Sequence, residues 1–395
     1  MQQQKVTIGN IFDTYGERYI TDHHITGQEK GLIRLLASCR EHALGSHFEK
    51  CTHCDYSNKA YNSCRNRHCP LCQQKDKVQW LEKQMDSLLP VGYYHLVFTI
   101  PHELNELCIT NKKVMYDILF KATSETILEL AKDVKHLGAD TGLITVLHTW
   151  GQNLKEHPHL HCIMPAGGLS FDNSHWVHTD KKDDFFVYYK VLSRKFSGKY
   201  IAFLRAALSK GLLKLKGNFA SKKYLNNLLV NLEQKEWVVN IQAPFGKPEQ
   251  VLEYLSRYVF RIAISNHRIR KIENGKVHFT WKNNRNGRSG VMKLGIDEFI
   301  HRFLLHVLPK GFFKVRYYGI FVNRYKKKNI ELAKALLQQE QNDLLLEKTE
   351  DGKIIPVKKH TFWDEIWPQI QGYKQPNCPV CKIGRLRFAG IVPRE

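Results

Sequence analysis

Two strand-like runs joined by a short polar stretch constrain the fold of this chain more than any other feature. "GLITVLHTW" and "PHLHCIMP" are rich in apolar and β-branched residues, and only "GQNLKEH" separates them. Such an arrangement indicates a β-hairpin, and the "AGG" that follows indicates a further turn. The sequence therefore predicts antiparallel strands over residues 142–165.

Other segments alternate between strand and helix signals. Strand signals continue at 93–100, 168–178 and 236–245, and a second hairpin, 264–282, turns at "ENGK". Helical periodicity is found over most of 1–50, and over 73–89, 103–137, 190–232, 248–261 and the polar tail after Asn323. Strands with hairpin connections and long helical insertions predict an α+β fold with an antiparallel sheet.

The hairpin carries an unusual set of histidines. His159 and His161 alternate on one strand and therefore share a face, while His148 lies eleven residues before His159 on the facing strand. Each histidine alone is explained by a solvated or core position, but three on one face predict a metal site with open coordination positions, which is typical of catalytic sites. His157, which precedes Pro158, and Gln152 are the alternatives to His148 as third ligand.

The net charge points to a polyanionic partner. The 395 residues include 60 Lys and Arg against 38 Asp and Glu, a formal charge of +22, and such a field attracts phosphate. A basic protein associated with ribosomes is the alternative. No apolar run approaches the roughly 18 residues that would suggest a membrane span, and "MQQQKVTIGN" lacks the apolar core of a signal peptide. We therefore expect a cytoplasmic protein with reduced cysteines.

Paired cysteines predict a zinc site near the N-terminus. Cys51 and Cys54 form one Cys-x-x-Cys pair, and Cys69 and Cys72 form a second. Two such pairs at this spacing can hold one tetrahedral Zn²⁺, with Cys64, His53 and His68 as substitute ligands or supporting groups. Between the pairs, Arg65 and Arg67 are candidates for phosphate contacts or members of a solvated loop. A third pair, Cys378 and Cys381, has no sequence partner, and an unmetallated turn explains it about as well as a metal site does.

The helix predicted at 248–261 supplies candidate nucleophiles. Tyr254 and Tyr258 are four residues apart and so share a helical face. Arg257 and Arg261, one step around the helix, are candidates for contacts with DNA. An amphipathic helix with aromatic core residues is the plain explanation. A metal that polarises phosphate would nevertheless need a nucleophile, and these hydroxyls are the best candidates.

The segments "YNSCRNRHCPLCQ", "HPHLHCIMPAGG", "YLSRYVFRIAIS" and "LPKGFFKVRYYGIFVNR" together resemble bacterial transposases of the insertion-sequence-ninety-one type. The similarity covers most of residues 30–325. The resemblance implies a zinc-binding N-terminal region and a rolling-circle nuclease core on an antiparallel sheet. His159 and His161 match the paired ligands of that family, and Tyr254 and Tyr258 match its two nucleophiles. His148 matches the third histidine of the related conjugative relaxases.

The resemblance also divides the chain and suggests its partners. Residues 1–89 would form a helical, zinc-binding and DNA-binding domain, residues 90–325 the nuclease domain, and residues 326–395 a basic helical tail with the lone Cys-x-x-Cys pair. The substrates would be single-stranded transposon ends and target DNA in the bacterial nucleoid. Since the chain has no helicase motif or P-loop, unwinding would fall to a host helicase.

Two points of chemistry stay open at this stage. The related nucleases use Mg²⁺ or Mn²⁺ at the histidine site, and Mn²⁺ suits imidazole better than Mg²⁺ does. The same nicking chemistry would also serve a plasmid replication initiator or a relaxase. A non-catalytic zinc-finger protein that binds DNA is the alternative from another class.

Overall fold

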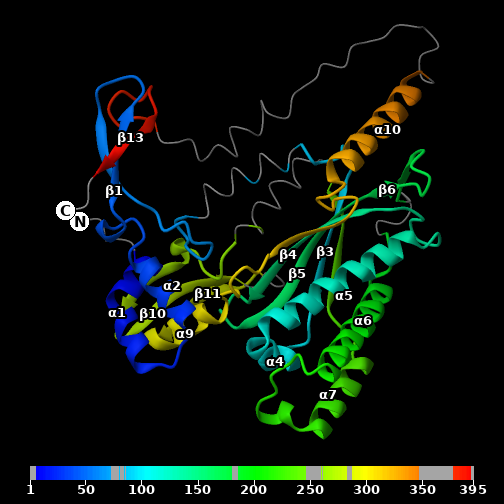
Figure 1. Cartoon of the computed structure of the whole chain (residues 1–395), viewed down its shortest axis with the longest axis horizontal. Helices are drawn as coiled ribbons and strands as arrows, with labels where there is room; N and C mark the ends of the chain where they lie inside the picture. The colour runs from blue at the N-terminus through cyan, green and yellow to red at the C-terminus, as the bar shows by residue number, and fades with distance from the viewer. Residues whose placement is uncertain are drawn as a thin grey trace.

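We describe the fold from a computed structural model of the chain. The described residues are 6–72, 80, 84, 86–179, 186–245, 259, 261–282, 287–346 and 377–392. The helices predicted at 73–89 and 248–261 lie mostly outside these residues. Helices and antiparallel sheets combine in one chain (Figure 1), which confirms the predicted α+β class.

A five-stranded antiparallel sheet forms the centre of the molecule. Its spatial order is β12 (Val315–Gly319), β4 (Gly142–Trp150), β5 (Glu156–Pro165), β3 (Tyr93–Thr99) and β8 (Val239–Phe245). Strands β4 and β5 form the predicted hairpin, in which His148 is paired with His159. Strands β3 and β8 confirm the strands expected at 93–100 and 236–245.

Helices cover one face of this sheet, as Figure 1 shows for α5 and α6. The helices that share its core are α4 (Asn105–Thr110), α5 (Lys112–Lys132), α6 (Tyr189–Ser209) and α7 (Lys222–Gln234). Leu96, Leu147 and Leu160 point from the three inner strands into this apolar layer. Because side chains alternate along a strand, the residues between them face the other side of the sheet.

A second core joins the N-terminal helices to residues far along the chain. Helices α1 (Ile8–Asp22) and α2 (Gly27–Ala37) pack with β9 (Ile269–Glu273), β10 (Lys276–Lys282), β11 (Ser289–Gly295) and α9 (Ile296–Leu305). Phe12 and Phe303 meet edge to face at 5.3 Å between ring centroids. The first predicted segment therefore shares its core with part of the second, and the three-part division of the chain stays a prediction.

The "ENGK" turn has the predicted form. Asn274 and Gly275 connect β9 to β10 with φ angles of 49° and 68°. Two successive positive φ angles are what a two-residue turn requires to match the twist of its strands, and Asn-Gly is the favoured pair for it. The hairpin expected at 264–282 is confirmed.

A third core and a small separate sheet complete the fold. Helix α10 (Lys326–Leu346) packs beside β6 (Gly167–Leu169) and β7 (Trp176–His178). The single strand expected at 168–178 is therefore replaced by these two short strands.

The helical region expected over residues 1–50 ends earlier than predicted, because β1 (Ser46–Cys51) pairs with β2 (Ser57–Tyr61) and β13 (Leu386–Val392). Short 3₁₀ turns lie at His42–Leu44, His102–Leu104, Gly217–Ala220 and Asn266–Arg268.

In the part of the chain that the structure describes, no helix combines the length and the apolar character that crossing a bilayer requires.

Candidate active site and metal-ligand clusters

Three histidines meet on the sheet face opposite α5 and α6. His148 comes from β4, and His159 and His161 come from β5. One ring nitrogen of each lies within 4.8 Å of those of the other two. The ring centroids of His148 and His161 are 4.6 Å apart, and those of His159 and His161 are 5.0 Å apart. The two-residue period of β5 and the register with β4 produce this cluster.

Burial keeps the imidazoles of His159 and His161 neutral. Desolvation lowers the pKa of His159 to about 3, and it lowers the pKa of His161 well below its ordinary value. The positive charge of Arg261 adds to both shifts. Neutral imidazole is the form that binds metal, because the lone pair on the unprotonated nitrogen is the ligand. The donor set therefore fits a divalent cation.

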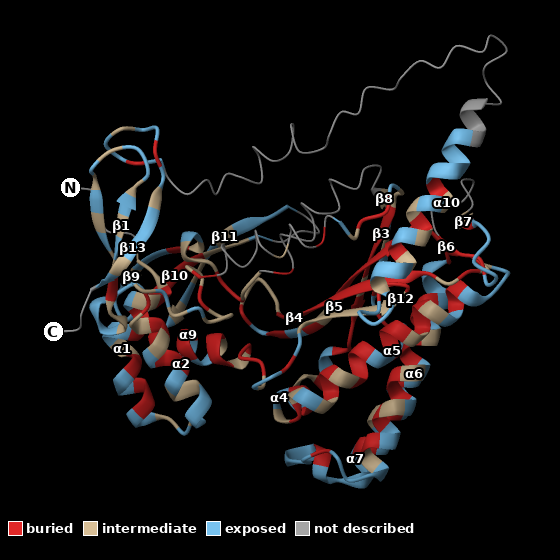
Figure 2. Ribbon diagram, turned by 45° about the horizontal axis from the view of Figure 1, so that its top comes forward, coloured by how far each residue is buried: buried red, intermediate tan, exposed pale blue. Residues whose placement is uncertain are grey.

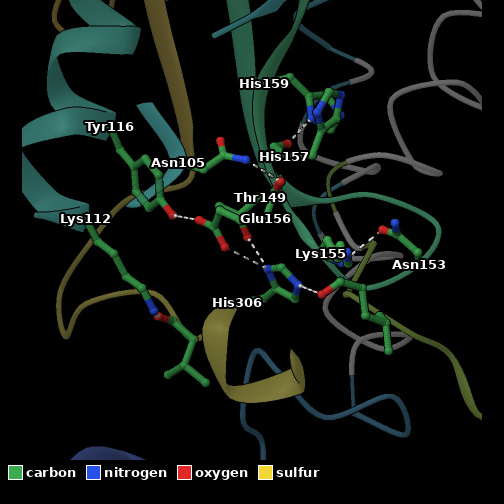
Figure 3. Close-up of polar contacts among 12 residues, drawn as sticks. Asn105, Lys112, Tyr116, Thr149, Asn153, Lys155, Glu156, His157, His159 and His306 are labelled. Carbon is green, nitrogen blue, oxygen red and sulfur yellow. Dashed lines mark hydrogen bonds and ion pairs between the residues drawn. The ribbon is translucent and has the colours of Figure 1, made fainter. Parts of the chain in front are cut away.

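The hydrogen bonds of the rings decide which nitrogen carries that lone pair. His159 Nδ1 lies 2.6 Å from the carbonyl oxygen of His157 (Figure 3), and since a carbonyl only accepts, Nδ1–H is the donor. The lone pair of His159 is then on Nε2. An imidazole held in one tautomer by a backbone carbonyl is typical of metal ligands in proteins.

His95 fixes the tautomer of His161 in a similar way. The sequence did not predict this role. His95 Nε2 lies 3.0 Å from His161 Nδ1, and His95 Nδ1 lies 3.0 Å from Gln242 Oε1. The amide oxygen accepts, so the protons run from His95 Nδ1 to Gln242 and from His161 Nδ1 to His95 Nε2. These two hydrogen bonds leave the lone pair of His161 on Nε2. The sequence signal was a lone histidine inside the apolar strand "YYHLVFTI".

His157 and Gln152, the two alternatives to His148 as third ligand, lie outside the histidine cluster. His157 is exposed, and it is the carbonyl of this residue that contacts His159. Gln152 lies in the turn between β4 and β5, where its carbonyl oxygen accepts a hydrogen bond of 2.7 Å from Arg268. His148 is the residue that the strand register brings to the histidine pair, although its role as a ligand stays a prediction.

Arg261 lies close enough to His159 and His161 to affect both pKa values, and a second cation contacts it. Arg261 lines a cavity together with Thr149, Trp150, His306 and Lys314. Lys314 Nζ donates to the carbonyl of Arg261 at 3.4 Å, and burial lowers the pKa of Lys314 to about 8, assisted by the charge of Arg67. Lys314 was not singled out from the sequence, although it lies in the resembling segment "LPKGFFKVRYYGIFVNR".

The predicted nucleophiles lie outside the described residues. Tyr254, Tyr258 and the neighbouring Arg257 fall in the range 246–258. Their roles stay predictions.

Arg67 makes structural contacts with the backbone between α9 and β12. Its two terminal nitrogens donate to the carbonyl oxygens of Phe312, Leu308 and Pro309 at 2.6, 3.3 and 2.8 Å. These bonds use part of the five N–H donors of the guanidinium group, and the contact of Arg67 with DNA stays a prediction. Arg65 is exposed, and its contact with DNA stays a prediction.

The cysteines form two clusters where the sequence predicted one. Cys69 and Cys72 meet Cys39 and Cys64, whereas Cys51 and Cys54 meet Cys378 and Cys381. The single site of Cys51, Cys54, Cys69 and Cys72 is therefore wrong as a grouping. The physical reason is that β13 pairs with β1 and brings the C-terminal pair to the end of β1, away from the core in which Cys69 and Cys72 are buried.

The first cluster fits a zinc ion. Its Sγ atoms are 3.6 Å apart for Cys39 and Cys72, 3.6 Å for Cys64 and Cys72, and 3.5 Å for Cys39 and Cys69. A Zn–S bond of about 2.3 Å gives tetrahedral S–S edges of about 3.8 Å. All ten cysteines of the chain are free, so thiol ligands are available. Cys39 was missed because it directly follows a helix and has no cysteine neighbour in the sequence.

A buried polar network lies three residues before His159. Glu156 Oε1 accepts a hydrogen bond of 2.9 Å from the Tyr116 hydroxyl, and its Oε2 lies 3.7 Å from His306 Nδ1 (Figure 3). Burial raises the pKa of Glu156 to about 7, against opposing effects of Tyr116 and Lys112. His306 Nε2 donates to the Leu154 carbonyl at 3.0 Å, so this network holds the turn between β4 and β5.

Known transposases are similar to this chain over most of its length. Residues 11–100 match the transposase zinc-binding domain, and residues 142–329 match a family described as putative transposase. A putative transposase of Sinorhizobium fredii, y4qJ, is 40% identical over 96% of this chain and 94% of its own length. The transposase for insertion sequence element IS801 of Pseudomonas savastanoi is 26% identical over 73% of this chain and 67% of its own length. No solved structure matches.

The zinc-binding match contains six of the eight clustered cysteines, and the second match contains all three clustered histidines. The similarity to y4qJ extends over nearly the whole of both proteins. The chain therefore belongs to the transposases of the IS91 type.

Proposed function

We propose that the protein cleaves and rejoins single-stranded DNA at transposon ends through a tyrosine covalently bonded to a 5′ phosphate. The observation that carries the proposal is the histidine cluster, in which His148, His159 and His161 meet on one sheet face and the rings of His159 and His161 are neutral. Three nitrogen ligands leave coordination positions for phosphate and water, as in catalytic metal sites. A bound Mg²⁺ or Mn²⁺ would polarise a non-bridging phosphate oxygen.

The reaction that we propose conserves a phosphodiester bond in each step. The Oη atom of Tyr254 or Tyr258 bonds to phosphorus while the bond from phosphorus to the 3′ oxygen breaks. The phenolic proton leaves to water, and the 3′ oxygen takes a proton and departs as a free hydroxyl. A 3′ hydroxyl later attacks the phosphotyrosine and releases the phenol, so rejoining needs no nucleotide hydrolysis.

The surroundings of the histidines support a nucleic-acid substrate. Arg261 is a cation next to the site and shares a cavity with Lys314, and the whole chain has a formal charge of +22. A groove beside the turn between β4 and β5 is lined in part by Lys155, Trp281 and Lys282. Lysines along such a groove suit a phosphate backbone, and an indole suits stacking on an unpaired base.

A covalent adduct is the direct test of this proposal. The full-length protein is incubated with end-labelled single-stranded DNA of the element's own termini and with Mg²⁺ or Mn²⁺, and the products are separated on a denaturing gel. We expect a labelled protein–DNA band and a released strand with a free 3′ hydroxyl. Tyr254→Phe and Tyr258→Phe each retain the ring, and only the double variant should lose every adduct.

The outcomes separate the proposal from its alternatives. An adduct that survives in the double tyrosine variant would place the nucleophile elsewhere. Binding without any metal-dependent cleavage would favour the non-catalytic DNA-binding protein. Cleavage of an origin-like sequence, with no cleavage of element termini, would favour a replication initiator or relaxase.

A further inference from the structure

The second cysteine cluster joins the two ends of the chain. Cys51 and Cys54 belong to the N-terminal region, and Cys54 and Cys378 are 324 positions apart in the sequence. Strand β13 nevertheless lies beside β1 and far from α10 (Figure 1). The match to the transposase zinc-binding domain ends at residue 100, well before the C-terminal pair.

The four sulfur atoms have the spacing of a tetrahedral thiolate site. Cys51 Sγ lies 3.7 Å from Cys381 Sγ, and Cys54 Sγ lies 3.7 Å from Cys378 Sγ. These distances agree with the roughly 3.8 Å edge of a ZnS₄ tetrahedron. They are much longer than the roughly 2.05 Å of a disulfide.

The backbone around the sulfurs is folded to stabilise thiolates. The amides of His53 and Cys54 donate to Cys51 Sγ at 3.3 and 3.4 Å. In the C-terminal pair the amide of Gly384 donates to Cys381 Sγ at 3.3 Å. Amide hydrogen bonds to sulfur favour its charged form, which is the form that binds metal.

The two pairs also fit against each other tightly. A Cβ atom on Gly384 would lie 2.3 Å from Cys51 Sγ, so only glycine permits this approach. The Thr52 amide donates to the Arg385 carbonyl at 3.0 Å, and the Arg385 amide donates to the Thr52 hydroxyl at 3.0 Å. The two loops therefore form one built site.

The small sheet has little else to hold it together. None of the three apolar cores formed by the described residues includes a residue of β1, β2 or β13. Phe48, Phe388 and Ile391 on these strands are exposed, and Figure 2 shows β13 as largely exposed, with β1 a mixture of exposed and intermediate residues. A sheet of this size without an apolar core needs a metal or a disulfide to be stable.

We propose that Cys51, Cys54, Cys378 and Cys381 bind a structural Zn²⁺ of their own, so that the chain carries two thiolate-bound zinc ions. This zinc fastens the C-terminal strand to the N-terminal zinc-binding region. Four thiolates close the coordination shell, which is typical of structural zinc. The inference does not rest on the proposed function, because it concerns neither the histidines nor the tyrosines.

Zinc content of paired variants tests the grouping. Elemental analysis and native mass spectrometry of the full chain are compared for C51S/C54S, C378S/C381S and the quadruple variant of these four residues. Each should contain one zinc fewer than the unaltered protein, and the quadruple variant should lose no more than either double variant. C108A and C162A, at buried cysteines outside both clusters, should retain all zinc.

Two results would overturn the inference. The first is an unchanged zinc content in C378S/C381S. The second is a quadruple variant of Cys51, Cys54, Cys69 and Cys72 that loses only one zinc, because those residues would then share an ion. If a variant fails to fold, native mass spectrometry of the unaltered chain decides, since loss of fewer than two zinc ions on acidification would also overturn it.

Hydrogen exchange provides an independent measure of the strand pairing. In C378S/C381S the amides of β1 that pair with β13 should lose protection, whereas the amides of β4 and β5 should keep it. Unchanged protection of β1 in a variant that has lost zinc would show that the metal does not fasten the strand. The adduct assay should give the same band for this variant, so failure of one proposal leaves the other intact.

Discussion

The central sheet and the small sheet obtain their rigidity from opposite sources. Strands β3, β4 and β5 press an apolar face against α5 and α6. Their other face carries the histidine cluster and, further along the strands, apolar residues of the third core such as Tyr93, Ile144 and Ile163. Strands β1, β2 and β13 contribute nothing to the apolar cores, and cysteines lie where the strands meet. The central sheet buries enough apolar area to be stable by itself, so its histidine cluster is available for chemistry. The small sheet buries little apolar area, so its cysteine ligands stabilise the fold.

The region around the first cysteine cluster combines both sources of stability, an apolar core and cysteine ligands. Cys39, Cys69 and Cys72 are buried in the core that α1 and α2 share with α9. Thiolates and apolar side chains therefore stabilise the same region. The comparison predicts that ligand loss has a different consequence in each of the three clusters.

The largest effect is expected on cleavage, from loss of a histidine ligand. His159→Ala should abolish detectable adduct formation and leave thermal unfolding, zinc content and DNA binding nearly unchanged, because the helix-covered face of the sheet is untouched. Adduct yield, zinc content and melting temperature of one preparation measure this. His157→Ala is the matched control, since the variant retains the carbonyl that contacts His159.

His148→Ala sharpens the same test. It should behave as His159→Ala does if His148 is the third ligand. An active His148→Ala protein combined with an inactive Gln152→Ala or His157→Ala protein would transfer that role to the residue whose loss inactivates the enzyme.

The second effect is on stability, from loss of the first cysteine cluster. C69S/C72S should lose one zinc and destabilise the N-terminal core by several kcal/mol, as loss of a structural metal does. C378S/C381S should lower the main melting temperature far less, because β13 lies outside the apolar cores. Calorimetry of both variants measures the difference, and equal destabilisation would contradict the contrast drawn between the clusters.

The sequence predicted the central sheet better than it predicted the cysteine grouping, for a physical reason. Alternation along a strand and a short turn are local, so His148, His159 and His161 could be placed on one face from spacing alone. Grouping cysteines requires knowing which strands pair, and Cys378 reaches Cys54 only through the long-range pairing of β13 with β1. His95 supports His161 from a neighbouring strand, and no local pattern marks such a contact.

A smaller effect is expected from loss of the His95 support. His95→Leu removes the acceptor for His161 Nδ1–H and should raise the Mn²⁺ concentration for half-maximal cleavage about 10- to 100-fold. Saturating Mn²⁺ should restore most activity, which a merely structural defect would not allow. His95→Gln offers a new acceptor and should restore part of the affinity, so equal metal dependence in both variants would contradict a positioning role.

The smallest effect concerns the pH dependence of stability at Glu156. Because its pKa is about 7 in the folded protein and near 4.5 in the unfolded chain, the unfolded state loses its proton first as pH rises. Folding stability from this group is therefore present below about pH 4.5 and is lost as the pH rises toward 7. Glu156→Gln mimics the protonated carboxyl and retains an oxygen for the Tyr116 hydroxyl.

Relative to the unaltered protein, the melting temperature of Glu156→Gln should therefore increase by a few degrees between pH 5 and pH 8. Contributions from His306 and from the thiolate clusters are common to both proteins and cancel in this difference. Thermal unfolding at several pH values measures it. A pH-independent difference would mean that Glu156 is already ionised in the folded state, and a decreasing difference would mean that its carboxylate stabilises the turn next to the histidine site.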